Sequence, residues 1–492
     1  MKTPPACVLQ DETAWCREEN AMRSVAGWWV AIALAMLGLA GAARAVKLDA
    51  GFDGDGWKTI GFDPLTAGAD FDRAYASCPG PDGTQIVSGM VRGISGSDWI
   101  GVVRLRPDGS LDPAFGSAGR RFIALSSGGT FSFGHAALCV GGGRTVVARS
   151  VSGGGTGACW NDAGAECNLQ LLRITAEGQL DPGFGTGGVT MLDLDDFRGG
   201  LAGGEAPLGL NRAASGELLL TGMAELAPAG GGQSRPFVAR FSADGALAGA
   251  SVPDLPGLSG AMSASGADYG PGGELWLVGD GDDASGQRVY YLGLLDAATL
   301  QPTATIRGGG GDDVLQGARL LRPGVLVAGS SWRAHGSSGP RTPRLVVFRQ
   351  GGISTLDLPP SAPIDGVATG ILSSAESIMP LDATHVLYGA QVVKRPAGGG
   401  FAHSGFHLAL ARIGATAAED AALPADAATV SYRSPSPSCA GQASQQVHTR
   451  LSLWNGAPVL VGSATRQCNP DTDSDWLIAR FTLGELFSDG FE

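Results

Sequence analysis

The sequence predicts an all-β protein built from repeats, and three recurring patterns support this prediction. The pattern Leu-Asp-x-x-Phe-x-x-x-Gly occurs at residues 48–56, 111–119 and 180–188. A turn followed by a short apolar strand occurs seven times, with last residues at 89, 149, 222, 279, 329, 389 and 462. An alternating strand follows each copy, as in DWIGVVRL (98–105) and DWLIARF (475–481). Runs of Val, Ile, Leu and aromatic residues bounded by Gly, Pro and Asp are typical of strands.

The spacing of the seven copies, about 62 residues on average, leaves room for four short strands in each repeat. An apolar stretch such as HAALCV (135–140) precedes each turn, and the Leu-Asp-x-x-Phe pattern leads into a fourth strand, as in RRFIAL (120–125). Four antiparallel strands repeated seven times predict a seven-bladed β-propeller over residues 46–482.

The two ends of the repeat region predict how the ring closes. No blade strands precede the first copy of the pattern, and the seventh repeat lacks a complete copy after its third strand. We therefore expect an N-terminal strand to complete the last blade, which removes an exposed sheet edge. ELFSDGFE (485–492), within a C-terminal tail of residues 483–492, is a degenerate copy that competes for the same position.

The Leu-Asp-x-x-Phe pattern is expected to separate blades rather than to catalyse a reaction. Its Leu and Phe would be apolar anchors between blades, and its Asp suits the start of a turn. Its glycines allow close backbone approach. The residues concerned are Leu48, Asp49, Phe52, Leu111, Asp112, Phe115, Leu180, Asp181 and Phe184.

Residues 1–45 are predicted to be a signal peptide. From Met22 onward, one Arg is followed by the apolar run Val25–Ala43 and by Ala-Arg-Ala, a site at which cleavage would follow Ala45. The 21 residues before Met22 contain Glu18, Glu19 and two cysteines and do not resemble a signal, so translation starting at Met22 is the favoured interpretation. An uncleaved membrane anchor is the alternative. We expect an exported protein, in the periplasm, the outer envelope or the medium, without a transmembrane segment in the mature chain.

Six cysteines follow the signal, and an even number in an exported chain predicts disulfides. The expected pairs are Cys159–Cys167, Cys439–Cys468 and Cys78–Cys139, although six cysteines allow many other connectivities. Metal binding is the competing interpretation, but the chain has no Cys-x-x-Cys pair to support it.

Net charge limits the partners. The chain carries a formal charge of −13 and four lysines, and it has no cluster of Lys and Arg. This argues against nucleic acid as a ligand, because phosphate-backbone binding requires such a cluster. A protein or a glycan is the expected ligand, and we expect a monomer.

Two segments resemble a known family. RLRPDGSLDPAFGSAG (104–119) and RITAEGQLDPGFGTGG (173–188) are similar to the delta-60 repeat of bacterial exported proteins. The resemblance is sharp over residues 46–190 and weakens over 200–482, where the Leu-Asp-x-x-Phe signature is lost. It implies an exported, propeller-like protein, and no catalytic residue is carried over from the family to this chain.

Local catalytic motifs are absent from the sequence. It has no G-x-x-x-x-G-K-[ST] loop, no H-E-x-x-H and no G-x-S-x-G. SGADYGPGGELW (265–276) does not have the spacing of the S-x-D-x-G-x-x-W boxes of sialidase propellers. His403 and His407 would lie about 13 Å apart on a strand, too far to share one metal ion.

The strongest metal candidate is the alternating row Asp471, Asp473 and Asp475, whose oxygens suit calcium. The row lacks the Gly and the final Glu of an EF-hand loop, so solvated turn carboxylates are the simpler interpretation. No other cofactor is expected beyond this structural calcium.

A non-catalytic binding or scaffold propeller is the function that the sequence favours. Its ligand would bind at the mouth of the channel or at the inserts 153–168, 196–206 and 431–445. One alternative is a propeller hydrolase or lyase acting on polysaccharide, since a fold does not exclude chemistry. Another is a structural or adhesion component of the cell surface. Candidate sugar-stacking side chains are Trp57, Trp99, Trp160, Trp276, Trp332, Trp454 and Trp476, although most are expected in the core.

Overall fold

A computed structural model describes one compact unit that begins at Val46. The described residues are 46–62, 70–92, 98–124, 135–152, 167–198, 201–226, 233–309, 314–332, 342–360, 370–371, 377–394, 403–430, 446–465 and 473–483. The predicted signal and almost all of the predicted tail lie outside them.

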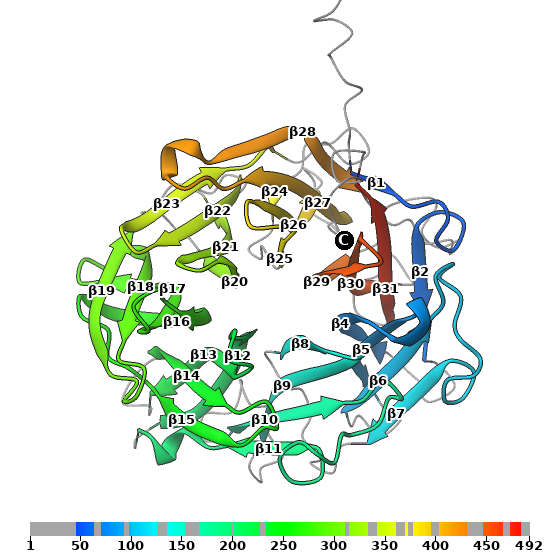
Figure 1. The fold of residues 1–492 in the computed structure, drawn as a ribbon, viewed down its shortest axis with the longest axis horizontal. Helices are drawn as coiled ribbons and strands as arrows, with labels where there is room; N and C mark the ends of the chain where they lie inside the picture. Colours follow the sequence, from blue (N-terminus) through cyan, green and yellow to red (C-terminus); the bar gives the residue numbers. More distant parts are fainter. Residues whose placement is uncertain are drawn as a thin grey trace, which may run out of the picture. The chain divides into compact units, whose positions relative to one another are not determined.

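The described strands form seven antiparallel sheets arranged as the blades of a β-propeller (Figure 1), which confirms the predicted fold class. From the inner to the outer strand, blade 1 contains β4 (Arg73–Pro79), β5 (Gln85–Arg92), β6 (Asp98–Leu105) and β7 (Arg120–Ala124). Blade 2 contains β8 (His135–Gly141), β9 (Arg144–Ser152), β10 (Cys167–Ile174) and β11 (Val189–Leu192). Blade 3 contains β12 (Leu201–Arg212), β13 (Leu218–Leu226), β14 (Ser234–Phe241) and β15 (Leu247–Ser251).

Blades 4 to 7 continue the ring in chain order. Blade 4 contains β16 (Leu258–Tyr269), β17 (Leu275–Asp283), β18 (Arg288–Leu295) and β19 (Pro302–Gly308). Blade 5 contains β20 (Val314–Arg322), β21 (Val325–Trp332), β22 (Thr342–Arg349) and β23 (Gly352–Asp357). Blade 6 contains β24 (Gly370–Ile371), β25 (Ser377–Pro380), β26 (His385–Lys394), β27 (His403–Arg412) and β28 (Ala421–Val430). The C-terminal strands of blade 7 are β29 (Gln446–Trp454), β30 (Ala457–Thr465) and β31 (Asp473–Thr482).

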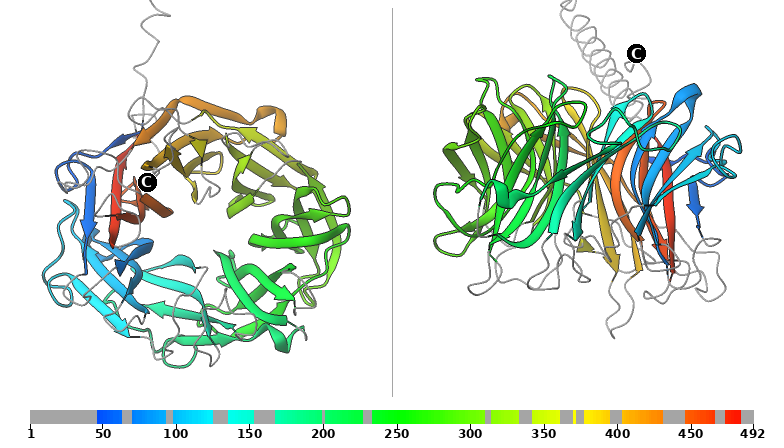
Figure 2. Two further views of the ribbon diagram at one scale, coloured as in Figure 1. Left: turned by 180° about the vertical axis from the view of Figure 1, so that it is seen from behind. Right: turned by 90° about the horizontal axis from the view of Figure 1, so that it is seen from below.

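The hydrophobic core is divided among the junctions between blades. Seven clusters of buried apolar residues occur in the described chain, and each one joins two neighbouring blades. The second and third strands of a blade are apolar on both faces because each face packs against a neighbouring blade; in β17 the first seven residues are all buried. The core therefore forms a ring of seven layers around the centre. The right panel of Figure 2 shows the ring of blades edge-on.

An N-terminal strand closes the ring, as predicted. The segments β1 (Lys47–Leu48) and β2 (Trp57–Ile60) both pair antiparallel with β31, and Trp57 lies opposite Ala479. A two-residue strand, β3 (Asp70–Phe71), pairs with the start of β31 in parallel. The N-terminal segment thus occupies the outer edge of blade 7, the position for which the degenerate C-terminal copy was the alternative candidate.

The Phe of each Leu-Asp-x-x-Phe copy is buried and crosses to the next blade. There it lies against the glycine of a hairpin turn, and a Cβ added to that glycine would come within 2.7 to 2.9 Å of the phenyl ring. These turn glycines have positive φ angles of 74° to 85°, which also favour glycine. The pairs are Phe52 with Gly109, Phe115 with Gly178 and Phe184 with Gly245.

The Asp of each copy pairs with the arginine that ends the third strand of the same blade. Nε–Oδ distances are 2.7 Å for Arg104–Asp112, 2.8 Å for Arg173–Asp181 and 3.1 Å for Arg480–Asp49. Hydrogen bonds from the Ala114 N–H and from Arg104 keep the pKa of Asp112 below its usual value. In blades 1 and 2 the arginine also stacks over the Phe ring, at 5.0 and 4.9 Å from its centroid. Leu111 and Leu180 pack at the edge of adjacent clusters.

Candidate functional site at the centre of the ring

The inner strands of blades 5 and 7 each carry an arginine near their middle. Arg319 lies on β20 and Arg450 on β29, and both side chains are half-buried. A β-bulge precedes each arginine, because the register of β20 shifts between Gln316 and Arg319 and that of β29 shifts between His448 and Arg450. A bulge redirects the side chain that follows it. The inner strands β4, β12 and β16 have a similar register shift, so the bulge is a repeated feature of the inner strands.

A hydrogen bond between non-neighbouring blades shows how closely the inner strands converge here. Asn211, which is buried on β12 of blade 3, donates from Nδ2 to the carbonyl oxygen of Ala318 in blade 5 at 3.1 Å. Arg319 donates from Nη1 to the same oxygen at 2.9 Å. Because blade 4 lies between blades 3 and 5, these contacts form on the inner side of the ring.

Burial perturbs both arginines. Burial lowers the pKa of Arg319 to about 10. Burial also lowers the pKa of Arg450 well below its usual value, and the positive charge of Arg319 lowers it further. Within the described parts of the chain, neither guanidinium forms an ion pair with a carboxylate.

Two inner-strand carboxyl groups also have perturbed pKa values. Glu205 on β12 is 4% exposed, and burial raises its pKa to about 8, although a hydrogen bond from the Leu194 N–H opposes this. Leu194 begins the 3-10 turn η3 (Leu194–Asp196). Asp268 on β16 is 3% exposed, and burial raises its pKa to about 6.

These two carboxyl groups lie far apart along the ring axis. Glu205 is opposite Ala224, two residues beyond Gly222 of β13, whereas Asp268 is opposite Trp276, three residues before the equivalent Gly279 of β17. The two positions are therefore five residues apart along the strand direction, which at about 3.3 Å per residue is roughly 16 Å. The paired carboxylates of glycoside hydrolysis lie within about 10 Å of each other. Glu205 and Asp268 therefore do not form an acid–base pair of that kind.

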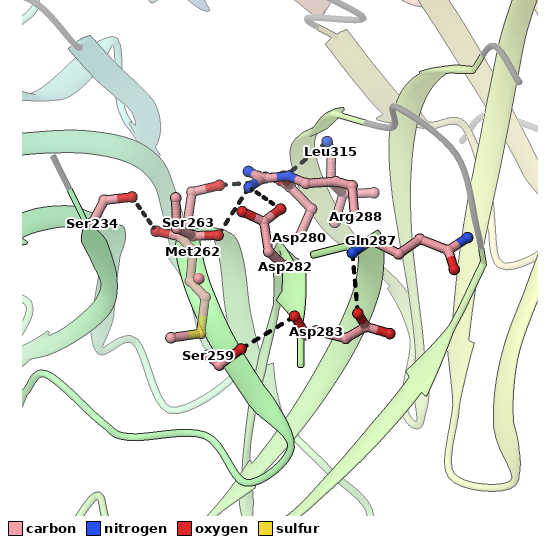
Figure 3. Close-up of polar contacts among 12 residues, drawn as sticks. Ser234, Ser259, Met262, Ser263, Asp280, Asp282, Asp283, Gln287, Arg288 and Leu315 are labelled. Atoms are coloured by element: carbon pink, nitrogen blue, oxygen red, sulfur yellow. Dashed lines mark hydrogen bonds and ion pairs between the residues drawn. The ribbon is translucent and has the colours of Figure 1, made fainter. Parts of the chain in front are cut away.

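A third charged cluster is saturated by its own contacts (Figure 3). Asp280 on β17 is fully buried and accepts hydrogen bonds from Arg288 Nε at 2.6 Å, Ser263 Oγ at 3.0 Å and the Leu315 N–H at 3.2 Å. Arg288 also reaches Asp282 at 3.2 Å. Burial raises the pKa of Asp280, against the effect of Arg288. Because Leu315 begins the next blade's inner strand, this network joins blades 4 and 5.

The predicted disulfides are partly visible. Cys78 on β4 and Cys139 on β8 are bonded and join blades 1 and 2. Cys167 is also disulfide-bonded, but its expected partner Cys159 lies outside the described residues. Cys439 and Cys468 lie outside them as well.

The predicted calcium row falls mostly outside the described chain. Asp471 and the side chain of Asp473 are not described, and Asp475 lies on β31 opposite Ala464. Among the residues that are described, no three His, Cys, Asp or Glu side chains gather in a way that could hold a metal ion.

The aromatic and histidine candidates are mainly part of the core. Trp57, Trp276, Trp454 and Trp476 are buried, whereas Trp332 is half-buried under the guanidinium of Arg344. Trp99 lies at the edge of the Phe122 ring, and Trp160 is not described. His403 and His407 lie on the same strand, β27, and buried His407 bonds to Thr429 and to the carbonyl of Pro359.

The sequence patterns did not single out Arg319, Arg450 or Asn211. Arg319 lies within GARLLR (317–322), one of the apolar stretches that precede a turn. A charged residue in the middle of a strand that is otherwise apolar and innermost is the signal that points to such a site.

The molecule is a seven-bladed β-propeller, and sequence comparison agrees with this fold. Residues 80–115 match the model of a β-propeller family described as a domain of unknown function, DUF5122. This segment runs from the first turn of blade 1 to Phe115. No curated protein matches the chain.

Solved propeller structures resemble the chain distantly. A protein of unknown function from Dyadobacter fermentans is 12% identical, with 72% of this chain and 94% of that chain covered and a TM-score of 0.44. An ulvan lyase, described as a new family of polysaccharide lyase, is 11% identical, with 87% and 96% covered and a TM-score of 0.45. A Hadza microbial sialidase is 11% identical, with 80% and 73% covered and a TM-score of 0.39.

Proposed function

We propose that this chain is an exported, non-catalytic β-propeller of the delta-60 repeat type that binds a ligand at the centre of its ring. The observation that carries the proposal is the convergence of the inner strands, shown by the hydrogen bond from Asn211 of blade 3 to the Ala318 carbonyl of blade 5. Arg319 and Arg450 lie half-buried on inner strands without a carboxylate partner in the described chain. A charge that is withdrawn from water is costly unless a partner compensates it. Such groups are therefore more readily explained by binding than by stability.

The covalent chemistry of the chain supports export. The Cys78–Cys139 disulfide joins two blades, and disulfides persist in oxidising compartments outside the cytosol. Among the described residues, the helical segments are only short 3-10 turns, and none could span a bilayer. The periplasm, the outer envelope and the medium all fit the proposal.

A non-catalytic role is favoured over a polysaccharide hydrolase or lyase. The two inner-strand carboxyls with raised pKa values, Glu205 and Asp268, lie at different levels of the ring. A further buried carboxylate, Asp280, is held by Arg288 and by two further donors.

Binding of the purified protein to fractionated envelope proteins and polysaccharides would test the proposal. We expect saturable binding to one fraction, without any shortening of the bound polymer. Repeating the measurement with EDTA tests whether calcium, held by the Asp471 row, is needed. Depolymerisation of the polymer, or the absence of saturable binding by folded protein, would contradict the proposed function.

A further inference from the structure

The outer edge of blade 2 differs from the other blade edges that the structure describes. Its outermost strand, β11, contains no charged residue and no proline, and it pairs with β10 without a register shift. Charges, prolines and bulges are the features that keep sheet edges from pairing with other chains. Every other described outermost strand has at least one of them: β7 carries two arginines, β15 has a bulge, β19 and β28 contain proline, β23 contains Asp357, and β1, β2 and β3 contain Lys47, Lys58 and Asp70.

The backbone of Met191 points outward from this edge. Val189 uses its N–H and its carbonyl oxygen for two hydrogen bonds to Thr186, at 3.3 and 2.8 Å, on the side of β11 away from β10. In an antiparallel pair the residues that bond to the neighbouring strand alternate with residues that face away, so Met191 is the next residue that faces outward. No further strand pairs with this side of Met191 within the described chain. Met191 therefore presents one donor and one acceptor to an added strand.

The three large apolar side chains that are exposed in the described chain all lie around this edge. Met191 on β11 is 50% exposed, Phe197 after η3 is 42% exposed and Leu247 at the start of β15 is 40% exposed. Thr190 Oγ1 donates to the Gly245 carbonyl at 2.8 Å, which places the start of β15 beside β11 (Figure 1). Exposed apolar side chains that gather in one region, unlike scattered ones, indicate an interaction surface.

The segment that follows β11 is acidic. Asp195 and Asp196 of η3 are exposed, and half-buried Asp193 accepts a hydrogen bond from the Asp195 N–H at 2.9 Å. The one cation between Val189 and Arg198 is Arg198 itself, which is paired with Asp254 at 3.0 Å. The edge therefore combines exposed apolar side chains with local negative charge.

This charge decides between two occupants of the edge. A second copy of the chain would bring an identical acidic segment to the same surface, and both copies carry a formal charge of −13. A segment with Lys or Arg beside its apolar residues complements the acidic groups instead.

We propose that the edge of β11 docks an extended segment of another protein, a strand of alternating apolar residues followed by Lys or Arg. The added strand pairs with the backbone at Met191, covers the side chains of Met191 and Phe197, and places its basic residues against η3. Addition of a strand to a sheet edge is an established mode of peptide recognition. Because β11 and the inner strand β8 are at opposite ends of the blade 2 sheet, this surface is separate from the ring centre and goes beyond the proposed function.

Fluorescence anisotropy with a labelled peptide of alternating Val and Thr followed by lysines would test this surface. One control peptide carries glutamates in place of the lysines, and another carries N-methyl groups that remove its backbone donors. We expect the lysine peptide to bind saturably, about tenfold more tightly than either control, and to bind less tightly as the salt concentration rises. Hydrogen exchange should show added protection at Met191 when the lysine peptide is bound.

Variants at exposed positions separate binding from folding. Met191→Lys places a charge in the edge and should weaken peptide binding by about tenfold or more. Ala304→Lys, which adds the same charge at an exposed residue of the outer strand β19, is the matched control and should bind like the unchanged protein. The double variant Asp195→Asn/Asp196→Asn should bind more weakly and with a smaller dependence on salt. Equal Tm values would show that all the variants are folded.

Equal peptide binding by Met191→Lys and Ala304→Lys would overturn the docking edge. Failure of the lysine peptide to bind, equal binding of the glutamate peptide, or protection at another blade edge would also overturn it. Dimerisation of the chain that Met191→Lys abolishes would reject the basic partner and assign the edge to a second copy.

Discussion

The junctions on one side of the ring are built by a repeated device, and those on the other side are built individually. At the three junctions from blade 7 to blade 3, a Phe side chain crosses to the next blade. An Arg–Asp pair within the blade that supplies the Phe holds the turn that carries this Phe. Between blades 5 and 6 the ion pair itself crosses the junction, because Arg349 Nη2 lies 2.6 Å from Asp420 Oδ1. Arg322 of blade 5 adds a hydrogen bond to the Ile413 carbonyl at 3.2 Å.

The contrast shows that the fold requires a particular geometry at the junction between blades, but not one particular sequence there. Each of these Phe side chains is an apolar plug between two blades. Such a plug can recur from blade to blade because its partner is only a glycine in a tight turn. A crossing ion pair needs a specific acid on the next blade, so it leaves no repeating signature. This explains why the repeat fades along the chain while the blades remain regular.

Loss of the plug at the closing junction should have the largest effect. Phe52→Ala would remove a fully buried ring that lies edge-on to Trp454, with 5.8 Å between centroids. We expect a loss of about 4 kcal/mol in the free energy of unfolding, measured by urea denaturation. Phe197→Ala, at a side chain that is 42% exposed, is the control and should change stability little. Equal effects of the two substitutions would show that the ring does not depend on the plug.

The disulfide between blades 1 and 2 should come next. The double variant Cys78→Ala/Cys139→Ala removes a bond between residues 61 apart in the sequence. We expect a loss of about 3 kcal/mol, because the unfolded chain gains conformational freedom. Denaturant unfolding of the oxidised proteins measures it, and an unchanged midpoint would mean that the Phe115 plug alone secures this junction.

Ion pairs from the two sides of the ring offer a direct comparison. Asp420→Asn breaks the crossing pair with Arg349 at a side chain that is 4% exposed, and we expect a loss of about 2 kcal/mol. Asp112→Asn breaks the more exposed pair with Arg104 within blade 1, and a smaller loss is expected. Thermal and urea unfolding of both variants would rank them; the reverse order would contradict the proposed difference between the junctions.

Per pH unit, the smallest of these effects is a gradual pH dependence near the junction of blades 2 and 3. Glu205 has a folded pKa of about 8 against an ordinary 4.5. Its contribution to stability is therefore complete below pH 4.5 and is lost as the pH rises toward 8, with a slope of up to about 1.4 kcal/mol per pH unit. Glu205→Gln should flatten this decline in urea unfolding measured from pH 5 to 8. A decline of the same slope in the variant would assign it to another group, such as Asp268.

Much of the fold could be predicted because its signals are local. Each turn-strand copy spans only a few residues. The repeat region lacks strands at its two ends, and this predicted which segment closes the ring. The role of Phe52, Phe115 and Phe184 between blades was also foreseeable, because a large apolar residue beside turn glycines has few other uses. The glycine against which each phenyl ring packs could not be predicted from the pattern, because this glycine belongs to the following repeat.

The sequence by itself determined the blade number, the strand order and the closing strand, because hydrophobic alternation and turn chemistry act over short distances along the chain. Only the tertiary structure decided which side chains meet at the centre. Asn211 of blade 3 and Ala318 of blade 5 are far apart in sequence and carry no shared motif, yet a hydrogen bond joins them. This bond forms because closing the ring brings together inner strands that are far apart in sequence. This convergence follows from the ring geometry, and no local pattern encodes it.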